Sequence, residues 1–582
     1  MNGQWSLKEL YLGYDTPEYR SDYTKLEETL NQLSNMELTD NLSTIKKVID
    51  LLEIQSDLTR KLYAFSSLQL STNTTHEPSL TAIAKLRKLL SNHAKTNARI
   101  DKFLGNIETD ITQDEKLTQY QFLFAELKQQ ATHLLSDEVE EVIATMNLSA
   151  GQSWSQLQSF LTSTVETEFN GESLTLSDIR NLAYADDSAT RKAAYETELA
   201  MYESIKEPVA FALNNIKSQV NDISRLRGYE SALEVTLEQS RMSKATLDAL
   251  IAAIKDALPS FQKYFKHKAG LLGYANGLPF YELFAPIGES VAKKFTVDEM
   301  KEYLVEHFNK FAPDLAELTT EVFDKEYVDL FPRKGKVGGA FCSNLTPIKQ
   351  SRILMNFDGN LRNVVTMAHE LGHAYHGSII QEHLPLNRSY TMPVAETAST
   401  FNENIIMNTV IAEANDKEKI GLLESLISDV AQIVVDILSR YIFETTVFEK
   451  RQDSFLFSKD LEAIMLEAQD QSYGEGLDPE FRHPFMWLCK GHYYSTGLSY
   501  YNFPYAFGGL FAKGLYVQYQ NDPTGFVEKY REMLYATTVG TVEETAAKMG
   551  IDVTTKDFWA SALKEYENMI EEFIQLTSDT ND

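Results

Sequence analysis

Residues 366–376 read Thr366-Met367-Ala368-His369-Glu370-Leu371-Gly372-His373-Ala374-Tyr375-His376, and this stretch decides the architecture that the chain must support. Two histidines four apart on a helix point the same way, so His369 and His373 can bind one metal ion. Imidazole pairs favour zinc, and a catalytic zinc site keeps one position open for water. Glu370 flanks the pair and can reach such a water as a general base. The pattern indicates metal-assisted hydrolysis.

The residues around the motif predict a helix with one inward face. Apolar and histidine residues recur at helical spacing: Leu361, Val364, Val365, Ala368, His369, Gly372, His373 and His376. Asp358 or Asn360 can cap the start, and Gly377 lies where the helix would stop. Gly372 costs about 1 kcal/mol relative to alanine in mid-helix, which makes sense if another segment approaches closely there. We interpret His376 as structural, because it lies one turn beyond the pair.

A third protein ligand is needed, and spacing directs the search. One class of zinc peptidase places a third histidine ten residues after the first, where this chain has Ile379. The next carboxylates are Glu396 and Glu403, seven apart and hence on one helical face. We predict Glu396 as the third ligand and Glu403 as the acceptor for a ligating histidine's other ring N–H.

The alternative is that both glutamates are solvated surface residues, the usual fate of this residue type. Their neighbours are apolar on several sides: Val394, Ala395, Ala398, Phe401, Ile405 and Ile406. A buried carboxylate needs a cation or a proton, and zinc would supply the cation.

Two further segments carry candidate functional residues. Glycines 335, 338 and 339 among alternating residues suggest strands that something approaches closely, and Ile353–Phe357 indicates another strand. A small sheet offers an edge to which an extended peptide can add, although connecting strands would look the same. The run from His492 to Gly509 is rich in tyrosine and glycine. A phenol O–H or an imidazolium N–H there could stabilise a tetrahedral oxyanion, whereas the common role of tyrosine is aromatic packing.

Together these motifs resemble the thimet oligopeptidase and oligoendopeptidase F family of zinc peptidases, the oligoendopeptidase F branch most closely. The resemblance is carried by residues 366–376, by Glu396 with Ser399 and Glu403, by residues 332–342 and 353–357, and by the aromatic run from His492. It implies a mostly α, two-lobed helical body around a deep channel that admits only short peptides. It also implies one zinc ion, with Glu396 among its ligands.

The resemblance extends to residues beyond the metal site. It matches a histidine and paired tyrosines of the family with His492, Tyr501 and Tyr505, of which Tyr501 is our first choice for contacting the oxyanion. Phe503 stands where some relatives have another tyrosine. The resemblance also favours a substrate-binding role for the segment that contains Gly338, Gly339, Ala340 and Phe341.

Composition limits the class and setting of the protein. The formal charge of -30 argues against nucleic acid as a partner, because phosphate contacts need lysine and arginine. No apolar stretch approaches 18 residues and the first residues lack a signal-peptide pattern, so we expect neither a membrane span nor a membrane partner. Two cysteines are too few for a disulfide framework, which favours the cytoplasm. The sequence leaves the oligomeric state open.

The chain reads as overwhelmingly helical, with a small β-sheet near the zinc helix. Helical periodicity is visible near residues 22–36, 43–70, 79–105, 114–147, 187–225, 244–270 and 297–318, and again beyond 397. A hairpin is predicted at residues 164–176, where Asn170-Gly171 suits a type I′ turn, followed by a helix capped by Ser177 or Asp178. We divide the chain softly into an N-terminal lobe, 1–195, and a catalytic lobe, 196–582.

Three functions are compatible with these observations. The first is a zinc endopeptidase that cleaves internal bonds of short peptides. The second is a carboxypeptidase or dipeptidase-like enzyme that trims peptides, which would need a cation to capture the terminal carboxylate. The third is a non-catalytic peptide-binding protein with a structural zinc. A structural site has four closed ligands and no need for Glu370, so the motif favours an enzyme.

Overall fold

The structure is a computed structural model that describes residues 3–288 and 294–579. The chain forms two compact units, each assembled from three segments. Unit 1 comprises Met1–His133, Ala292–Thr409 and Gln518–Gly550, and unit 2 comprises Leu134–Val291, Val410–Val517 and Ile551–Asp582. The chain thus passes between the units several times, and our division into lobes near residue 195 stays a prediction.

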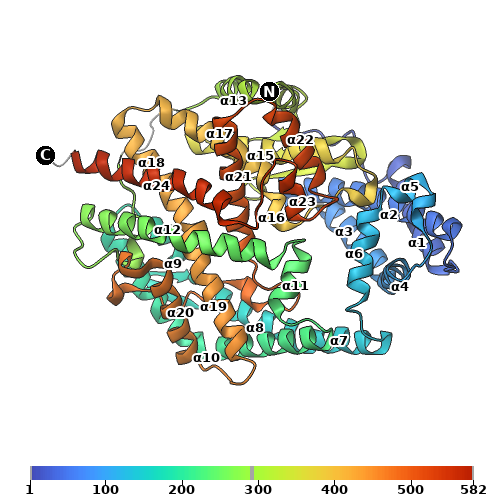
Figure 1. Cartoon of the computed structure of the whole chain (residues 1–582), viewed down its shortest axis with the longest axis horizontal. Helices are drawn as coiled ribbons and strands as arrows, with labels where there is room; N and C mark the ends of the chain where they lie inside the picture. Colours follow the sequence, from blue (N-terminus) through green and yellow to red (C-terminus); the bar gives the residue numbers. More distant parts are fainter. Residues whose placement is uncertain (1–2, 289–293, 580–582) are drawn as a thin grey trace. The chain divides into compact units, whose positions relative to one another are not determined.

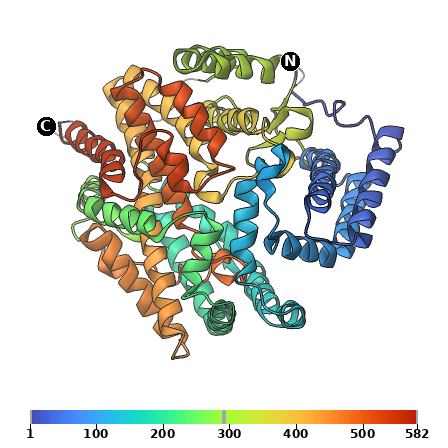
Figure 2. The ribbon, with the colours of Figure 1, turned by 45° about the vertical axis from the view of Figure 1, so that its right-hand side comes forward.

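The N-terminal part of unit 1 is built from helices with ordinary sequence signals. Its α-helices are α1 (Pro17–Asn35), α2 (Leu42–Thr72), α3 (Glu77–Asn92), α4 (Ala94–Gly105), α5 (Glu115–Thr118) and α6 (Gln121–Ala131). The side chains of Thr16 and Asn41 accept hydrogen bonds from the first turns of α1 and α2 and so fix where these helices begin. α1 packs on α2, α2 on α3, and α4 on α6. Figure 2 draws this part of the chain in shades of blue.

The rest of unit 1 places a small sheet beside the helix that carries the histidines. Its elements are α13 (Val297–Phe311), α14 (Pro313–Asp324), β3 (Val328–Asp329), β4 (Phe341–Leu345), β5 (Gln350–Leu354), α15 (Leu361–Ile380), α16 (Met392–Ala395), α17 (Thr397–Glu413), α22 (Phe526–Ala536) and α23 (Val542–Ala547). The strand order is β3-β5-β4, with β3 parallel and β4 antiparallel to β5. α15 packs against β4 and β5 (Figure 1), which confirms the small sheet near this helix.

The described residues of unit 2 form helices and one hairpin. It contains α7 (Asp137–Ser149), α8 (Gly151–Thr164), β1 (Glu166–Phe169), β2 (Glu172–Thr175), α9 (Leu176–Asn181), α10 (Ser188–Leu226), α11 (Ala232–Gln239), α12 (Lys244–Leu271), α18 (Asp416–Ala431), α19 (Ile437–Lys450), α20 (Ser458–Tyr473), α21 (Phe503–Asn521) and α24 (Lys556–Asp579). A π-helical turn, Gln432–Asp436, joins α18 to α19. α12 and α24 pack side by side (Figure 1).

The predicted hairpin is confirmed, and its turn shows why. Asn170 and Gly171 both have positive φ, 53° and 84°, as a type I′ turn requires. The expected cap of the next helix was wrong: Thr175 caps α9 and Asp178 completes a capping box, because the strand ends one residue earlier than predicted.

The mostly helical fold class is confirmed. Three predicted helical stretches are divided. Residues 79–105 form α3 and α4, which meet at His93, and residues 297–318 form α13 and α14, which meet at Ala312, before Pro313. Residues 114–147 form α5, α6 and α7. In residues 3–288 and 294–579, no helix is long and apolar enough to cross a membrane.

Candidate metal centre

Helix α15 presents the two motif histidines from a well-capped start. The Asn360 side chain accepts a hydrogen bond of 3.0 Å from the backbone N–H of Asn363, which confirms one of the two predicted caps. The predicted end at Gly377 was wrong, since the helix continues to Ile380. Gly377 instead makes room for the Asn344 side chain from β4, which donates to the carbonyl of His373 at 3.1 Å.

Gly372 is required by a close approach between two backbones. A Cβ at this position would lie 2.5 Å from Cα of Ser399 and 2.6 Å from the carbonyl carbon of Ala398. The expected approach of another segment beside the histidines is therefore present, and that segment is the start of α17. Because Glu396 immediately precedes α17, this contact sets the distance between the glutamate and the histidines.

We predicted that Glu396 and Glu403 lie on one face of a continuous helix, and this is wrong for Glu396. It is the residue that ends the short α16, with φ -94° and ψ 7°, and α17 begins at Thr397. Its neighbours Val394, Ala398 and Phe401 are buried as expected. The turn places its carboxylate towards α15.

Three side-chain atoms converge in a triangle of metal-site size. Nε2 of His369 and Nε2 of His373 lie 3.1 Å apart, and each lies 3.3 Å from Oε2 of Glu396. In a tetrahedral zinc site with bonds of about 2.0–2.1 Å, ligand atoms are separated by about 3.3–3.4 Å. The triangle therefore matches one face of a tetrahedron and leaves the fourth corner for another ligand. The residues fit a bound metal ion.

Neighbouring groups orient these three atoms. Nδ1 of His369 is hydrogen-bonded to Oε1 of Glu403, so its Nε2 is directed towards the triangle. Ser399 Oγ donates to Oε2 of Glu396 at 2.7 Å. Ser399 had no predicted role of its own, although its spacing of three residues from Glu396 was the available signal.

The charge state of the cluster suits a cation. Burial lowers the pKa of His369, but the Glu403 carboxylate outweighs burial and raises that pKa to about 9. Burial raises the pKa of Glu396, but its contact with His373 lowers that pKa to about 2, so the carboxylate is ionised. With Glu370 close by, three carboxylates surround two imidazoles and attract positive charge. That charge is a proton on His369 or, once Nε2 of His369 has lost this proton, a divalent ion.

Glu370 lies with the histidines but is held differently. One ligand atom each from His369, Glu370 and His373 lies within 4.8 Å of the others. Glu370 is buried, and its Oε2 has no hydrogen-bond partner among the described residues. Burial raises the pKa of this carboxyl above its usual value. A carboxylate with a free oxygen and a raised pKa is suited to accepting a proton.

His376 is structural, as we interpreted it. It is fully buried, its Nε2 is hydrogen-bonded to Thr537 Oγ1 at 2.8 Å, and its ring stacks on Tyr390 with centroids 4.4 Å apart. Nε2 and one face of the ring thus contact residues of two other segments.

The segment before β4 is a loop rather than the predicted strand. Gly335 and Gly339 have positive φ, 86° and 78°, and the two carbonyls of Val337 and Gly339 accept hydrogen bonds from the Asn356 amide. A Cβ at either Gly338 or Gly339 would meet no atom within 4 Å, so the loop borders open space. The second strand, β5, begins and ends three residues earlier than predicted.

Strand β4 lies at the edge of its sheet, since only β5 pairs with it in the part of the chain that the structure describes. Its first residue, Phe341, follows Ala340 and packs its ring on Trp5 with centroids 6.2 Å apart. The opposite edge of the strand offers backbone groups to an added strand.

In unit 2, His492, Tyr501 and Tyr505 come together. The two tyrosine hydroxyls are 2.8 Å apart, and the His492 ring stacks on the Tyr501 ring with centroids separated by 5.5 Å. Tyr505 is exposed and His492 is half-buried. Asn502, to which the sequence analysis gave no role, is hydrogen-bonded to His492 at 2.8 Å.

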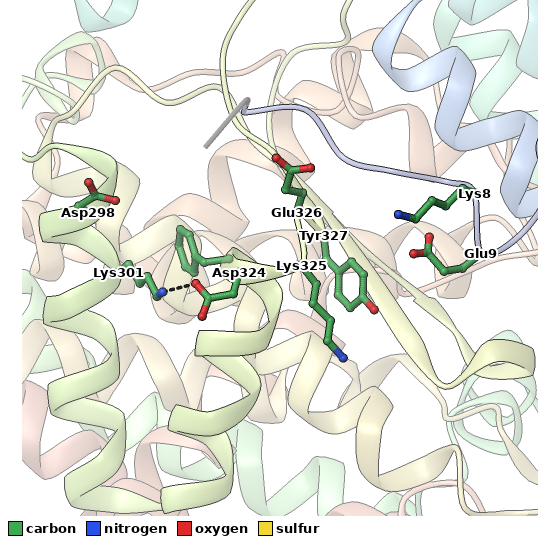
Figure 3. A pocket seen from close by; sticks show the side chains of 9 residues that line it. Lys8, Glu9, Asp298, Lys301, Asp324, Lys325, Glu326 and Tyr327 are labelled. Carbon is green, nitrogen blue, oxygen red and sulfur yellow. Dashed lines mark hydrogen bonds and ion pairs between the residues drawn. The ribbon is translucent and has the colours of Figure 1, made fainter.

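A surface pocket of about 530 Å³ lies in unit 1. Figure 3 shows the side chains that line it. Acidic and basic side chains alternate in its wall, and Lys301 pairs with Asp324. The lining residues are Lys8, Glu9, Asp298, Lys301, Phe323, Asp324, Lys325, Glu326 and Tyr327. None of the predicted site residues lines it.

A mostly helical protein with two histidines one turn apart, a third carboxylate at matching distance and a buried glutamate between them has the features of a metallopeptidase. Comparison with known proteins identifies the family. The model of Peptidase family M3 matches residues 181–565, well over half of the chain, and the model described as Oligopeptidase F matches residues 106–166. The chain therefore belongs to peptidase family M3 and is a metalloendopeptidase.

Relatives and a solved structure match nearly the full length of the chain. The chain is 22% identical to Oligopeptidase PepF of Bacillus subtilis (strain 168), over 98% of this chain and 87% of that protein. It is 25% identical to Group B oligopeptidase PepB of Streptococcus agalactiae, over 92% and 91%. The crystal structure of oligoendopeptidase-F from Enterococcus faecium is similar with a TM-score of 0.72 at 21% identity, covering 97% of this chain and 99% of that one.

Proposed function

We propose that this protein is a zinc-dependent endopeptidase that hydrolyses internal bonds of short peptides. The observation that carries the proposal is the triangle of His369, His373 and Glu396, whose edges of 3.1–3.3 Å suit one zinc ion. The names of the relatives, oligopeptidases and oligoendopeptidases, support short peptides as substrates.

Zinc bound at this triangle would supply Lewis acidity to a water molecule and to the scissile carbonyl. Glu370 accepts the proton of the attacking water through its free oxygen and passes it to the leaving amine. Glu403 keeps the ring of His369 oriented, and Ser399 holds the carboxylate of Glu396.

The edge of β4 and the loop before it are proposed to bind the substrate. An extended peptide would pair with the backbone of β4, beginning at Phe341, while the open space around Gly338 and Gly339 admits its side chains. Ala340 connects the loop to the strand and adds little bulk. Main-chain pairing of this kind explains how peptides of different sequence can be accepted.

His492, Tyr501 and Tyr505 are proposed to donate hydrogen bonds to the oxyanion of the tetrahedral intermediate. Tyr501 is the first choice, and its hydroxyl lies 2.8 Å from that of Tyr505. When the Tyr505 hydroxyl donates to the Tyr501 oxygen, the Tyr501 O–H is left free to donate to the oxyanion. Removing such a donor costs about 10²–10³-fold in turnover.

The test is cleavage of an internally quenched peptide of about ten residues, with products mapped by mass spectrometry. Internal cuts that stop on chelation and return with zinc are expected. Stepwise loss of C-terminal residues would instead indicate a trimming enzyme. Absence of cleavage, or cleavage that the chelator does not stop, would refute the proposed zinc-dependent endopeptidase. Glu370→Gln should retain zinc and fold while losing about 10²–10⁴-fold in turnover. Wild-type turnover in this variant would refute the role of Glu370.

A further inference from the structure

Asn502 is buried between an arginine and the histidine of the aromatic segment. Nη1 of Arg440 donates to Oδ1 of Asn502 at 3.1 Å, and Nδ2 of Asn502 lies 2.8 Å from Nε2 of His492. A guanidinium group can only donate hydrogen bonds. The Asn502 atom that faces Arg440 must therefore be the carbonyl oxygen, and the amide NH2 must face His492.

This arrangement fixes the tautomer of His492. Because the Asn502 amide donates, Nε2 of His492 must accept, and the ring proton must reside on Nδ1. In residues 3–288 and 294–579, Nδ1 has no hydrogen-bond partner, so its N–H is available to a ligand. The ring thus has one donor, and the direction of that donor is set by Asn502.

The charges around His492 keep it neutral. Arg440 from α19, Lys490 from its own segment and Lys217 from α10 face the ring, and Asp436 is the acidic group among them. Burial first, and then these cations, lower the pKa of His492 to about 3. A donor that is neutral at neutral pH replaces the imidazolium that we considered from the sequence.

Arg440 is itself held firmly at this place. It forms an ion pair with the buried Asp436, which also accepts a hydrogen bond of 3.3 Å from the hydroxyl of Tyr473. Asp436 is the last residue of the π-helical turn that joins α18 to α19. Such turns are rare and occur often at functional sites, since they shift the following side chains relative to a regular helix.

We propose that Asn502 and Arg440 are positioning residues for peptide hydrolysis: they hold His492 as the neutral tautomer whose Nδ1–H donates to the substrate. This inference rests on the proposed function, in which His492 is one of the oxyanion donors. Neither Asn502 nor Arg440 touches the substrate in this scheme. Both act through the imidazole.

Asn502→Asp tests the inference with almost no change in shape. One oxygen of the new carboxylate still accepts a hydrogen bond from Arg440. The other oxygen replaces the amide NH2 that faces Nε2 of His492, and because it can only accept a hydrogen bond, it favours a proton on Nε2. At low pH the imidazolium keeps an Nδ1–H, whereas at higher pH the Nε2–H tautomer has none. The ratio of variant to wild-type kcat should therefore fall by about tenfold or more between pH 6 and pH 8.5, with little change in KM. A ratio that does not change with pH would overturn the inference.

Two controls separate this outcome from others. Asn221→Asp, in the same unit, alters an amide that donates to the Phe448 carbonyl at 3.1 Å and should give a ratio that is flat with pH. His492→Gln tests the proposed function itself, and wild-type activity in it would remove His492 from the mechanism. If His492→Gln is impaired, Asn502→Asp should cause no further pH-dependent loss in that background. The same loss there would show that Asn502 acts independently of His492.

A measurement on the unmodified enzyme avoids the risk that Asn502→Asp fails to fold. Nitrogen NMR of protein labelled at the histidine ring nitrogens, with His492 assigned by its loss in His492→Gln, reports the tautomer directly. A protonated Nδ1 and an unprotonated Nε2 at pH 7 are expected. An Nε2–H tautomer or an imidazolium at that pH would refute the inference.

Discussion

Gly372→Ala should loosen the metal centre, although alanine is the better helix former. In an open helix the substitution stabilises by about 1 kcal/mol. Here the added Cβ would lie 2.5 Å from Cα of Ser399, and ordinary contact begins at 3.4 Å, so the two backbones must part by about 0.9 Å. Overpacking of this kind costs about 1–3 kcal/mol, which outweighs the helix propensity.

The larger effect concerns the metal. Ser399 hydrogen-bonds Oε2 of Glu396, so a movement of the α17 backbone moves this carboxylate relative to His369 and His373. Metal–ligand distances tolerate about 0.2 Å, several times less than the required displacement. We expect zinc affinity to fall by about tenfold or more, within the range found when the supports of a metal site are altered.

The assay is zinc competition with a chromophoric chelator, accompanied by thermal unfolding. Gly270→Ala is a matched control, because Gly270 is an exposed helical glycine in α12 and a Cβ there would meet no atom within 4 Å. This control should be neutral or slightly stabilising and should leave zinc affinity unchanged. If Gly372→Ala binds zinc as tightly as wild type and unfolds at the same or a higher temperature, the close approach does not set the site geometry.

Three further predictions concern other charged groups. Glu396→Ala should lose zinc in direct metal analysis, and wild-type zinc content would exclude it as a ligand. Glu403→Gln, which weakens the acceptor for His369, should reduce zinc affinity by about 10–100-fold in the same competition assay, and unchanged affinity would contradict its role. Lys513 is buried, and burial lowers its pKa from 10.5 to about 8, which corresponds to about 3 kcal/mol of destabilisation while the folded protein carries the charge. Between pH 8 and 10.5 the folded state releases this proton before the unfolded state does, so the cost declines there. Lys513→Met should therefore raise the unfolding temperature at pH 7 and lose this advantage towards pH 10.5, and a pH-independent difference would argue against a buried charge.

Local features of the fold were predictable because their causes are local. Asn360 caps α15 and Asn170-Gly171 forms its turn through atoms only a few residues away. Helical periodicity likewise located α10 and α12 to within about one residue. The segment before β4 was wrongly predicted as a strand, although Gly335 and Gly339 have positive φ. Alternation in the sequence does not reveal which residue leaves the extended conformation.

The metal triangle was predictable in composition but not in shape. Residue types and apolar surroundings identified His369, His373 and Glu396, yet the assumed single helical face for Glu396 and Glu403 was wrong. The helix is interrupted at Glu396, and the carboxylate reaches α15 because the start of α17 approaches Gly372 closely. Gly372 indicated that some segment approaches the helix, but the identity of that segment depends on which two helices meet in space, and no spacing along the chain encodes this.

The hydrogen bonds of Asn502 show the same limit for chemistry. Asn502 lies in a turn of the aromatic segment that the sequence already indicated, but its partner Arg440 lies 62 residues away on α19. Only the pair determines which way the amide points, and only the amide determines which nitrogen of His492 carries the proton. The position of a histidine in a motif can predict that it donates a hydrogen bond. Whether it donates as a neutral ring or as a cation follows from neighbours that the fold brings to it.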